Sequence, residues 1–588
     1  MSTKPTKKNQ ESDLLKEKII KLQKQLESFK HSNDHFLKNK LFLHYDIKEP
    51  EKVVVDCEAN LPVLAEVDKK KIQKGKELDP THLIIEGDNY HALSVLNYTH
   101  TGKIDLIYID PPYNTGNRDW KYNNDYVDAE DSFRHSKWLS FMASRLRLAK
   151  NLMKDDGFIV CAIDHYELFY LGILMDTVFG EENRLGIVSV VHKPEGRNQE
   201  KFFGTSNEYA LFYAKNKKLA NFNKIAIDDE ILEAFDQEDK KGRYRLKNFI
   251  RLADGKYATR SAKPNFWYPI YVSKDLKDIS LDKKSGYYEV YPIIGSGVER
   301  TWKTLPNTFL ELLKEGSIVA DLEENGKIVI YEKLRENQVI KTHWIKKEYH
   351  AYHHGTKPLE AILGEAKLFD FPKSVILIED ILRLTTNSSA TILDFFAGSG
   401  TTGHAVLRLN AQDSGTRQFI LCTNNENKIA EDVTYPRIKK VIDGYGDNTP
   451  IPANLRYFQT DFVEKKGSAS QLKIDLTRQC AEMLCVKENV FEAVKLKNVA
   501  KNYKFFKNGD KYLGVFFDFF TDAEFAGFIK ELNILPKEAE KAVYVFVLDG
   551  SAGILADEFA GVENCEVKEI PQKILDIYKQ LAREVARK

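Results

Sequence analysis

The sequence is poor in the features that mark secreted and membrane proteins. It contains six cysteines in 588 residues, scattered along the chain and without a C-x-x-C pair, so we expect neither a disulfide framework nor a zinc site. No apolar run reaches the length that spans a bilayer, and the lysine-rich start has no apolar signal segment. These absences predict a cytoplasmic protein without membrane association.

An excess of charge of one sign is also missing. The 87 Lys and Arg residues balance 87 Asp and Glu residues, so no overall field attracts the chain to nucleic acid, and any DNA binding must come from local basic patches. The sequence has no P-loop ending in G-K-[ST], and we find no nuclease-like or metal-binding cluster. ATP hydrolysis and DNA cleavage are therefore not expected of it. Its length suffices for two to four domains.

The first informative stretch, residues 104–113, is an apolar run that ends in D-P-P-Y. Such a run is typical of a parallel strand buried on both faces, and the prolines end the strand because they lack an N–H for the sheet. Asp110 and Tyr113 would then lie at the carboxyl edge of a sheet, where open α/β folds bind ligands. The Asp110 carboxylate and the Pro111 carbonyl could accept both hydrogens of an exocyclic amine, while Tyr113 stacks on the base. An ordinary Asp-Pro turn explains this stretch equally well.

A second strand-and-turn stretch, residues 391–403, reads T-I-L-D-F-F-A-G-S-G-T-T-G and is followed by a predicted helix. Glycines at such a turn let the backbone approach a ligand and point helix N-terminal amides at it. The spacing is not the G-x-G-x-x-G of dinucleotide-binding folds. The alternative is a tight turn that binds nothing.

Together the two stretches closely resemble the amino-methyltransferase family that modifies DNA with S-adenosylmethionine. Its members carry a D-P-P-Y tetrapeptide and an F-x-G-x-G loop, here at residues 110–113 and 396–400. The order of the motifs is that of the permuted branch, which places its target-recognition region between them. F-D-F-P-K at 369–373, N-E-Y-A-L-F-Y-A-K at 207–215 and C-T-N-N-E-N at 422–427 further resemble the modification subunits of Type III restriction systems.

The resemblance implies an α/β fold with a doubly wound, mostly parallel sheet of the Rossmann-like methyltransferase type. Alternating predicted strands and helices after residue 82 favour the same sheet. We expect a target-recognition domain inserted into it and a small C-terminal α/β domain after it. The expected divisions are a start with a short amphipathic helix (1–45), a catalytic half (46–215), a target-recognition domain (216–350), a cofactor-binding half (351–455) and the C-terminal domain (456–588).

The resemblance also implies the site residues, with S-adenosylmethionine as the cofactor and no metal. Catalysis would fall to Asp110, Pro111, Pro112 and Tyr113. Asp88 could equally be an N-cap of the following helix, and Glu426 follows Asn425 where many cofactor-binding folds have a lone acid. The implied cofactor contacts are Asp88, Lys373, Asp394, Phe396, Ala397, Gly398, Ser399, Gly400, Thr401 and Glu426.

Two basic stretches are candidates for DNA contact. The polar loop at 192–199 contains Lys193 and Arg197, and a solvated loop is the alternative reading of it. Residues 240–272 carry nine Lys and Arg residues against one acid, interleaved with aromatic residues. Phosphates attract such cations, and aromatic faces suit unstacked bases. From this second stretch we expect DNA contacts by Arg243, Arg245, Arg251 and Arg260.

The expected reaction is methylation of adenine N6 in double-stranded DNA. In the family D-P-P-Y goes mostly with adenine and S-P-P-Y with cytosine, so cytosine N4 is the second hypothesis, and a non-catalytic DNA-recognition subunit is the third. The target base must leave the duplex to be reached. A homodimer and a separate ATP-dependent restriction subunit are the expected protein partners. An apolar stripe with helical spacing fits a dimer contact or a helix packed on its own domain: Leu15, Ile19, Leu22, Leu26 and Phe29.

Overall fold

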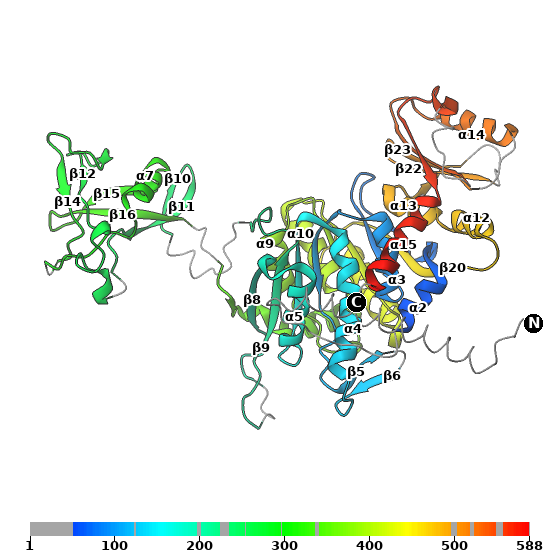
Figure 1. Ribbon diagram of the computed structural model, residues 1–588, viewed down its shortest axis with the longest axis horizontal. Helices are drawn as coiled ribbons and strands as arrows, with labels where there is room; N and C mark the ends of the chain where they lie inside the picture. The colour runs from blue at the N-terminus through cyan, green and yellow to red at the C-terminus, as the bar shows by residue number, and fades with distance from the viewer. Residues whose placement is uncertain are drawn as a thin grey trace, which may run out of the picture.

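The computed structural model describes ten stretches of the chain (Figure 1), and the predicted N-terminal helix and Arg197 lie outside them. Within the described part, no helix is long and apolar enough to cross a bilayer. The described residues are 51–122, 125–196, 201–223, 235–252, 255–295, 297–335, 340–495, 502–517, 522–547 and 557–586.

A sheet of eleven strands forms the body of the molecule, and its centre is parallel from β20 through β3, β19, β18 and β4 to β7. The predicted doubly wound, mostly parallel sheet is therefore confirmed. β9 is antiparallel to both β7 and β8, and β2 (Ile72–Gln73) pairs with β20. In spatial order the other strands are β1 (Asn60–Glu66), β20 (Asn454–Glu464), β3 (Thr81–Glu86), β19 (Gln418–Thr423), β18 (Thr391–Asp394), β4 (Ile104–Ile109), β7 (Met153–Ile163), β9 (Asn207–Ala214), β8 (Arg184–Val191) and β17 (His343–Trp344).

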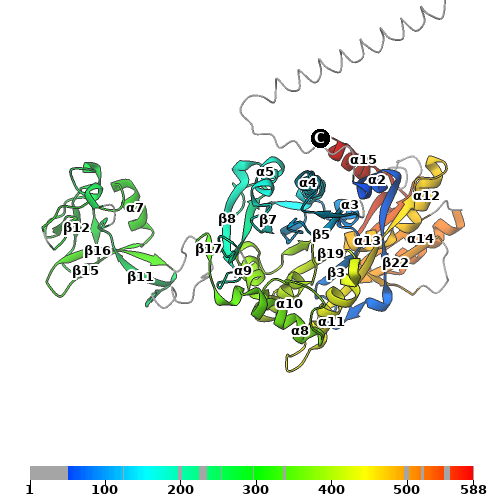
Figure 2. The same cartoon turned by 90° about the horizontal axis from the view of Figure 1, so that it is seen from below.

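Helices cover both faces of this sheet (Figure 2). α3 (Asn89–Thr99), α4 (Arg134–Leu152) and α5 (Leu168–Phe179) lie on one face, and α8 (Lys357–Leu363), α9 (Val375–Thr385), α10 (Thr401–Asp413) and α11 (Tyr435–Asp443) on the other. Side chains of β4 enter both cores: Ile107 and Ile109 belong to the first, and Leu106 and Tyr108 to the second. This explains why the strand is apolar on both faces from Leu106 to Ile109 instead of alternating.

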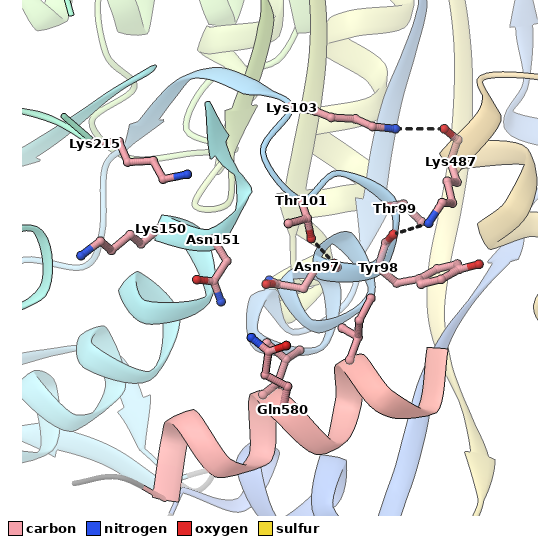
Figure 3. A pocket seen from close by; sticks show the side chains of 12 residues that line it. Asn97, Tyr98, Thr99, Thr101, Lys103, Lys150, Asn151, Lys215, Lys487 and Gln580 are labelled. Carbon is pink, nitrogen blue, oxygen red and sulfur yellow. Dashed lines mark hydrogen bonds between the residues drawn. The ribbon is translucent and has the colours of Figure 1, made fainter. Parts of the chain in front are cut away.

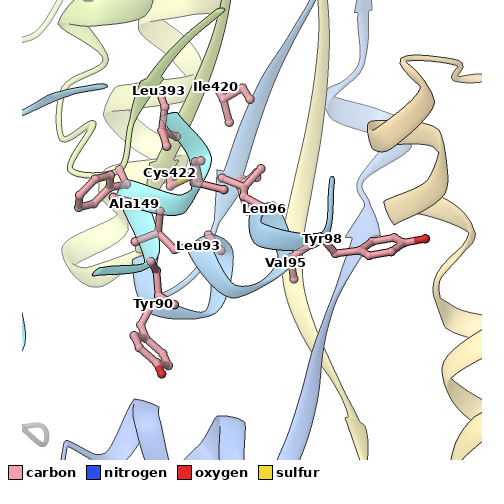
Figure 4. Close-up of a cluster of buried hydrophobic side chains, with 14 of the residues drawn as sticks. Tyr90, Leu93, Val95, Leu96, Tyr98, Ala149, Leu393, Ile420 and Cys422 are labelled. Atoms are coloured by element: carbon pink, nitrogen blue, oxygen red, sulfur yellow. The ribbon is translucent and has the colours of Figure 1, made fainter. Parts of the chain in front are cut away.

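α3 shows how the first face is filled. Its Leu93 and Leu96 are fully buried and share a core with Leu393 of β18 and with Ile420 and Cys422 of β19 (Figure 4). Burial of each such side chain contributes about 1.5–3 kcal/mol. This packing holds α3, the helix that follows β3, against β18 and β19, the strands before and after the second motif.

The chain winds in opposite directions from the two central strands. From β4 it passes through α4 to β7 on one side, and from β18 through α10 to β19 on the other, while β4 and β18 pair with each other. Such a reversal of strand order is where doubly wound folds bind their ligands, at the carboxyl ends of the strands.

The segment between the two motifs contains a separate unit with its own hydrophobic core, seen at some distance from the large sheet in Figures 1 and 2. The expected domain end at 350 falls beyond β17, which pairs with β8 in the large sheet. The unit has a four-stranded sheet of β10 (Gln237–Asp239), β11 (Gly242–Asn248), β16 (Ile328–Arg335) and β15 (Ile318–Leu322), a three-stranded sheet of β13 (Ile279–Ser280), β12 (Ile270–Val272) and β14 (Tyr288–Val290), and helix α7 (Pro306–Lys314).

The C-terminal unit is attached to the large sheet more closely than expected. The expected boundary at 455 falls inside β20, and α15 (Gln572–Ala586) contacts α3 and α4. The remaining elements of this unit are α12 (Ala469–Gln479), α13 (Ala481–Glu488), β21 (Glu492–Ala493), β22 (Tyr503–Asn508), β23 (Lys511–Phe516), α14 (Asp522–Ile534), β24 (Glu540–Phe546) and β25 (Cys565–Ile570). Near the start of the described chain lies α2 (Lys52–Ala59), and β5 (Asn117–Tyr122) pairs with β6 (Asp125–Asp128).

Candidate active site

The two sequence motifs meet at one edge of the sheet although about 280 residues separate them. β18 pairs in parallel with β4, with Ile392 opposite Leu106 and Leu393 opposite Ile107. Asp110 directly follows β4, and the small-residue loop directly follows β18. Because parallel strands end on the same side, D-P-P-Y and F-F-A-G-S-G lie side by side at the carboxyl edge.

Asp110 belongs to a cluster of four polar side chains. The Tyr113 hydroxyl lies 2.8 Å from Asp110 Oδ1 and 3.0 Å from Glu208 Oε2, and it can donate to one of them at a time. Lys373 Nζ donates to Glu208 Oε2 and lies 3.4 Å from Asp110 Oδ1. Lys373, which was expected at the cofactor, lies beside Asp110 and Glu208. Glu208, at the start of β9, was not predicted as a site residue.

The charges of this cluster depend on each other. Burial raises the pKa of Asp110, and Glu208 raises it further, against the opposing effect of Lys373. Burial also opposes ionisation of Glu208, but Lys373 outweighs it and the pKa of Glu208 is lowered. For Lys373, burial lowers the pKa, but the two carboxylates raise it above its usual value. The cluster thus holds a charged lysine against Glu208 and leaves Asp110 as the carboxylate that is easiest to protonate.

The D-P-P-Y turn is held from behind by hydrogen bonds. Trp138 of α4 donates Nε1–H to the Pro112 carbonyl at 2.7 Å. Asn114 is fully buried with a positive φ of 54°, a conformation that Asn adopts more readily than most residues. Its side chain accepts from Trp120 Nε1 at 2.9 Å and donates to Glu167. These contacts fix the backbone from which the Asp110 and Tyr113 side chains extend.

Glu167 is a buried acid that the sequence did not reveal. Its side chain is fully buried, and His135 Nδ1 lies 2.5 Å from its Oε1. Burial raises the pKa of Glu167 to about 8, although the hydrogen bond from Asn114 and the charge of Arg134 work against this. Near neutral pH Glu167 is therefore largely protonated and acts as a neutral support for Asn114.

Asp394 shapes the second loop from inside. Its Oδ1 accepts the Phe396 N–H at 3.0 Å and its Oδ2 accepts the Thr402 hydroxyl at 2.6 Å. The residue is 3% exposed, and burial raises its pKa to about 7. Its expected contact with a cofactor would have to compete with both hydrogen bonds.

The glycines of this loop adopt conformations that favour glycine. Gly398 has a φ of +47° and Gly400 of +77°, and a Cβ on Gly398 would lie 3.0 Å from the Phe369 ring. Thr434 donates to the Gly398 carbonyl at 2.6 Å. Phe369 belongs to the F-D-F-P-K stretch, so this stretch covers the loop. The backbone, more than side chains, is what residues 396–401 offer to a ligand.

Arg437 of α11 holds the loop from its buried side and was also missed by the sequence. It is fully buried and donates to Ser399 Oγ at 3.0 Å and to Thr401 Oγ1 at 2.8 Å. Burial lowers its pKa to about 9. The Ser399 and Thr401 hydroxyls therefore face the protein, and Arg437 fixes the start of α10.

Asp88 and Glu426, two of the three acids expected at the cofactor, already have partners. Asp88 caps α3 by accepting the Tyr90 N–H at 2.7 Å, which is the alternative the sequence offered, and it pairs with Arg145 at 3.2 Å. The neighbouring Asn89 donates to the Phe395 carbonyl at 3.0 Å and ties this turn to the second loop. Glu426 pairs with Lys121 of β5.

Comparison with known proteins agrees with this geometry. A family model described as DNA methylase matches residues 104–433, which include both motifs and more than half of the chain. The chain belongs to the DNA methylase family. It is 33% identical over 408 residues to the Mod subunit of the Type III restriction-modification enzyme EcoPI of Escherichia phage P1, covering 63% of this chain and 62% of that protein. It is also 33% identical over 377 residues to the Type II methyltransferase M.KpnI of Klebsiella pneumoniae, covering 61% and 88%.

The likeness to solved structures is weaker. The cytosine-N4-specific PvuII DNA methyltransferase aligns with a TM-score of 0.32 and 11% identity, covering 62% of this chain and 93% of that one. Among the sequence relatives, the match to this chain spans less than two thirds of the EcoPI Mod subunit and 55% of the StyLTI Mod subunit of Salmonella typhimurium.

The residues of this DNA methylase that were predicted to contact DNA lie in different parts of the structure and differ in their partners. Lys193 is exposed in the loop after β8, at the same sheet edge as Asp110. Arg243 and Arg245 are alternate residues of β11 and so share one face of that strand. Arg243 donates to the Phe235 carbonyl at 3.1 Å and Arg251 to the Lys303 carbonyl at 2.7 Å, and Arg260 pairs with Glu299 at 3.1 Å.

The interleaved aromatic residues were expected to offer faces to bases, and for several this is wrong. Phe249 is fully buried and Tyr268 is 9% exposed, and both belong to the core of the 235–335 unit. Tyr257, at 62% exposure, does lie on the surface. A small unit with short strands needs large side chains to fill its core, and composition alone does not separate these from surface aromatics.

Proposed function

We propose that this DNA methylase transfers a methyl group from S-adenosylmethionine to N6 of adenine in double-stranded DNA, as the modification subunit of a Type III system. The observation that carries the proposal is the meeting of Asp110–Tyr113 with the glycine loop at the point where the strand order reverses. One motif offers a carboxylate and an aromatic ring, and the other offers backbone amides at a helix start.

The Asp110 edge suits an exocyclic amine. The N6 lone pair is delocalised into the adenine ring, so the amine is a poor nucleophile until it is oriented. The Asp110 carboxylate and the Pro111 carbonyl would accept its two N–H groups, since the Pro112 carbonyl already accepts from Trp138. Tyr113 would leave its hydrogen bond to Asp110 and stack on the base. Positioning of this kind can contribute several kcal/mol, with a limit of about 7–11 kcal/mol.

The loop after β18 fits the cofactor that the family implies. When bound, S-adenosylmethionine would supply an electrophilic methyl group on a sulfonium. The backbone of residues 396–401 would hold it. At Gly398 a Cβ would crowd the Phe369 ring that covers this loop. Asp88 and Glu426 would accept hydrogen bonds from its hydroxyl or amino groups, and Lys373 would separate it from Glu208.

The amine must release a proton when it gains a methyl group. Asp110 is the acceptor closest to it, and burial together with Glu208 raises the pKa of Asp110 and so its proton affinity. Lys373, 3.4 Å away, limits this rise and so favours the ionised form of Asp110. Glu208 and Lys373 thus act as positioning residues that balance the charge of Asp110.

The assembly is the part of the proposal that rests most on relatives. Several relatives are named Mod subunits of Type III enzymes, and we infer a homodimer that docks a separate ATP-dependent restriction subunit. The alternative is a methyltransferase outside a Type III system. The Type II methyltransferase M.KpnI, 88% of which the match covers, supports it. Light scattering of the full chain, with and without DNA, tests the dimer, and a monomer under both conditions contradicts it. Truncation at 456 is unsuitable for this test because it cuts β20.

A transfer assay tests the activity. The full chain is incubated with duplex DNA and S-adenosylmethionine labelled in its methyl group, and the DNA is then digested to nucleosides. We expect the label in N6-methyldeoxyadenosine. Label in N4-methyldeoxycytidine would replace the base assignment, and bound cofactor without any transfer would make the chain a non-catalytic recognition subunit.

A further inference from the structure

A cavity lies at the opposite, amino edge of the large sheet. Its volume is about 480 Å³, within the range of small-molecule sites. The turn from α3 to β4, the end of α4, and residues of α13 and α15 line it, so it lies where the C-terminal unit meets the catalytic sheet (Figure 3). The methyl-transfer proposal uses none of these residues.

Lysines dominate the charge of this cavity. Four of its 12 lining residues are Lys103, Lys150, Lys215 and Lys487, and within the described part of the chain no Asp or Glu lines it. Figure 3 shows Lys103 and Lys487 together on one side, and Lys150 and Lys215 on the other. Thr99, Thr101 and Gln580 add polar groups between them.

Backbone carbonyls meet only part of the hydrogen-bonding capacity of the lysines. Lys103 Nζ donates to the Lys487 carbonyl at 3.3 Å, and Lys487 Nζ donates to the Tyr98 carbonyl at 3.1 Å. An ammonium group has three donors. A carbonyl also carries no charge to balance the ammonium, so both groups can still serve an anion.

The acids nearby balance only part of this charge. Glu488 is next in sequence to Lys487 but accepts from Tyr544 at 2.7 Å and pairs with Lys568 at 3.1 Å. Lys215 pairs with the exposed Asp155 at 3.0 Å. Burial lowers the pKa of Lys487 to about 8, and the nearby charge of Lys103 adds to this effect. The cavity therefore concentrates positive charge that an anion would relieve.

We propose that this cavity binds a phosphate-bearing small molecule of about nucleotide size. The ammonium groups of Lys103 and Lys487 lie together on one wall and suit a phosphate group, which is a strong acceptor for lysine, whereas Lys150 and Lys215 on the other wall donate to the Val178 and Met153 carbonyls. Duplex DNA held at Asp110 does not reach it, because the six residues of β4 separate the two edges by about 20 Å. Since Lys103 directly precedes β4 and Lys487 belongs to α13, the ligand would strengthen the attachment of the C-terminal unit.

Calorimetry on the full chain tests this site. S-Adenosylhomocysteine is kept in excess so that the methyl-donor site cannot account for binding. We expect pyrophosphate and uridine diphosphate to bind, with an affinity that falls as salt is added, and uridine not to bind. Absence of binding by pyrophosphate and uridine diphosphate at millimolar concentration overturns the proposal. So does displacement of pyrophosphate by duplex DNA, which would assign the lysines to nucleic acid.

A double variant, Lys103→Gln with Lys487→Gln, locates the binding. We expect its affinity for pyrophosphate to fall about tenfold or more, because charge-assisted hydrogen bonds are lost. Lys466→Gln is the matched control, since Lys466 is 79% exposed and pairs only across the surface with Glu464. Equal affinity in the double variant and the control would contradict the assignment.

A footprint on the wild-type chain keeps the test independent of variant folding. The lowered pKa of Lys487 makes its amine reactive near pH 8. We expect pyrophosphate to slow its modification by an amine reagent, read by mass spectrometry, and to leave Lys466 unchanged. Equal rates at Lys487 with and without pyrophosphate would refute the site even if pyrophosphate binds elsewhere.

Discussion

The carboxyl edge of the large sheet and the 235–335 unit use the same kinds of side chain in different ways. At the sheet edge, Asp110, Glu208 and Lys373 are tied to one another and held from behind by buried groups. On β11, Arg243 and Arg245 follow each other along one face of a strand in a small unit. The first arrangement fixes one geometry, whereas the second spreads charge. We therefore expect large effects from single changes at the sheet edge and graded, salt-dependent effects on the unit.

The largest effect is expected from Asp110→Ala. Methyl transfer should fall by about a thousandfold or more, because the amine loses the acceptor that orients it. Cofactor affinity should stay close to that of the wild type, since Asp110 faces the base. Transfer is measured with labelled S-adenosylmethionine and affinity by calorimetry. Turnover retained at the wild-type rate would remove Asp110 from the mechanism.

Gly398→Val should act on the cofactor instead of the base. Its Cβ would lie 3.0 Å from Phe369 and its φ of +47° is strained for a branched residue, so we expect cofactor affinity to drop about a hundredfold. Gly172→Val on α5 is the matched control, because a Cβ there meets nothing within 4 Å. Similar affinity in both variants would show that the loop does not hold the cofactor.

On the 235–335 unit the comparison predicts graded losses. Arg243→Ala combined with Arg245→Ala should weaken DNA binding about tenfold and lower the slope of log affinity against log salt by about 1.8, the value for two phosphate contacts. A binding titration at several salt concentrations decides. Equal slopes for the wild type and the double variant would show that the phosphate contacts do not lie on β11.

The last expected effect is a pH dependence of stability from Glu167. Its pKa is raised from 4.5 to about 8 by burial, so between these values the folded protein keeps a proton that the unfolded chain has released. Stability relative to Glu167→Gln should fall as pH rises through this window, by at most about 1.4 kcal/mol per pH unit, and be flat outside it. Denaturant unfolding of both proteins from pH 4 to 9 measures the difference. Parallel stability curves would contradict the buried protonated acid.

The contrast between the two regions also shows what sequence could predict. The sequence singled out Asp110 and Gly398 because each stands in a distinctive motif that follows an apolar strand. Glu208 was missed because only the antiparallel placement of β9 beside β7 brings its first residues to the same edge. Glu167 and Arg437 act from behind the motifs, on other elements, and no local pattern marks them. In the 235–335 unit Phe249 and Tyr257 looked alike in sequence, since burial there depends on how short strands pack.

The central claim is tested most directly by hydrogen–deuterium exchange, because this method reads both regions in one experiment. S-Adenosylhomocysteine is added first, and a DNA duplex that contains the methylated site is added second. We predict that S-adenosylhomocysteine slows exchange at residues 396–401 and 87–90 and leaves 97–103 and 242–248 unchanged. Adding the duplex should then slow exchange at 110–116 and 242–248. Protection that is absent at 396–401, or confined to the amino edge at 97–103, would contradict the placement of methyl transfer at the carboxyl edge.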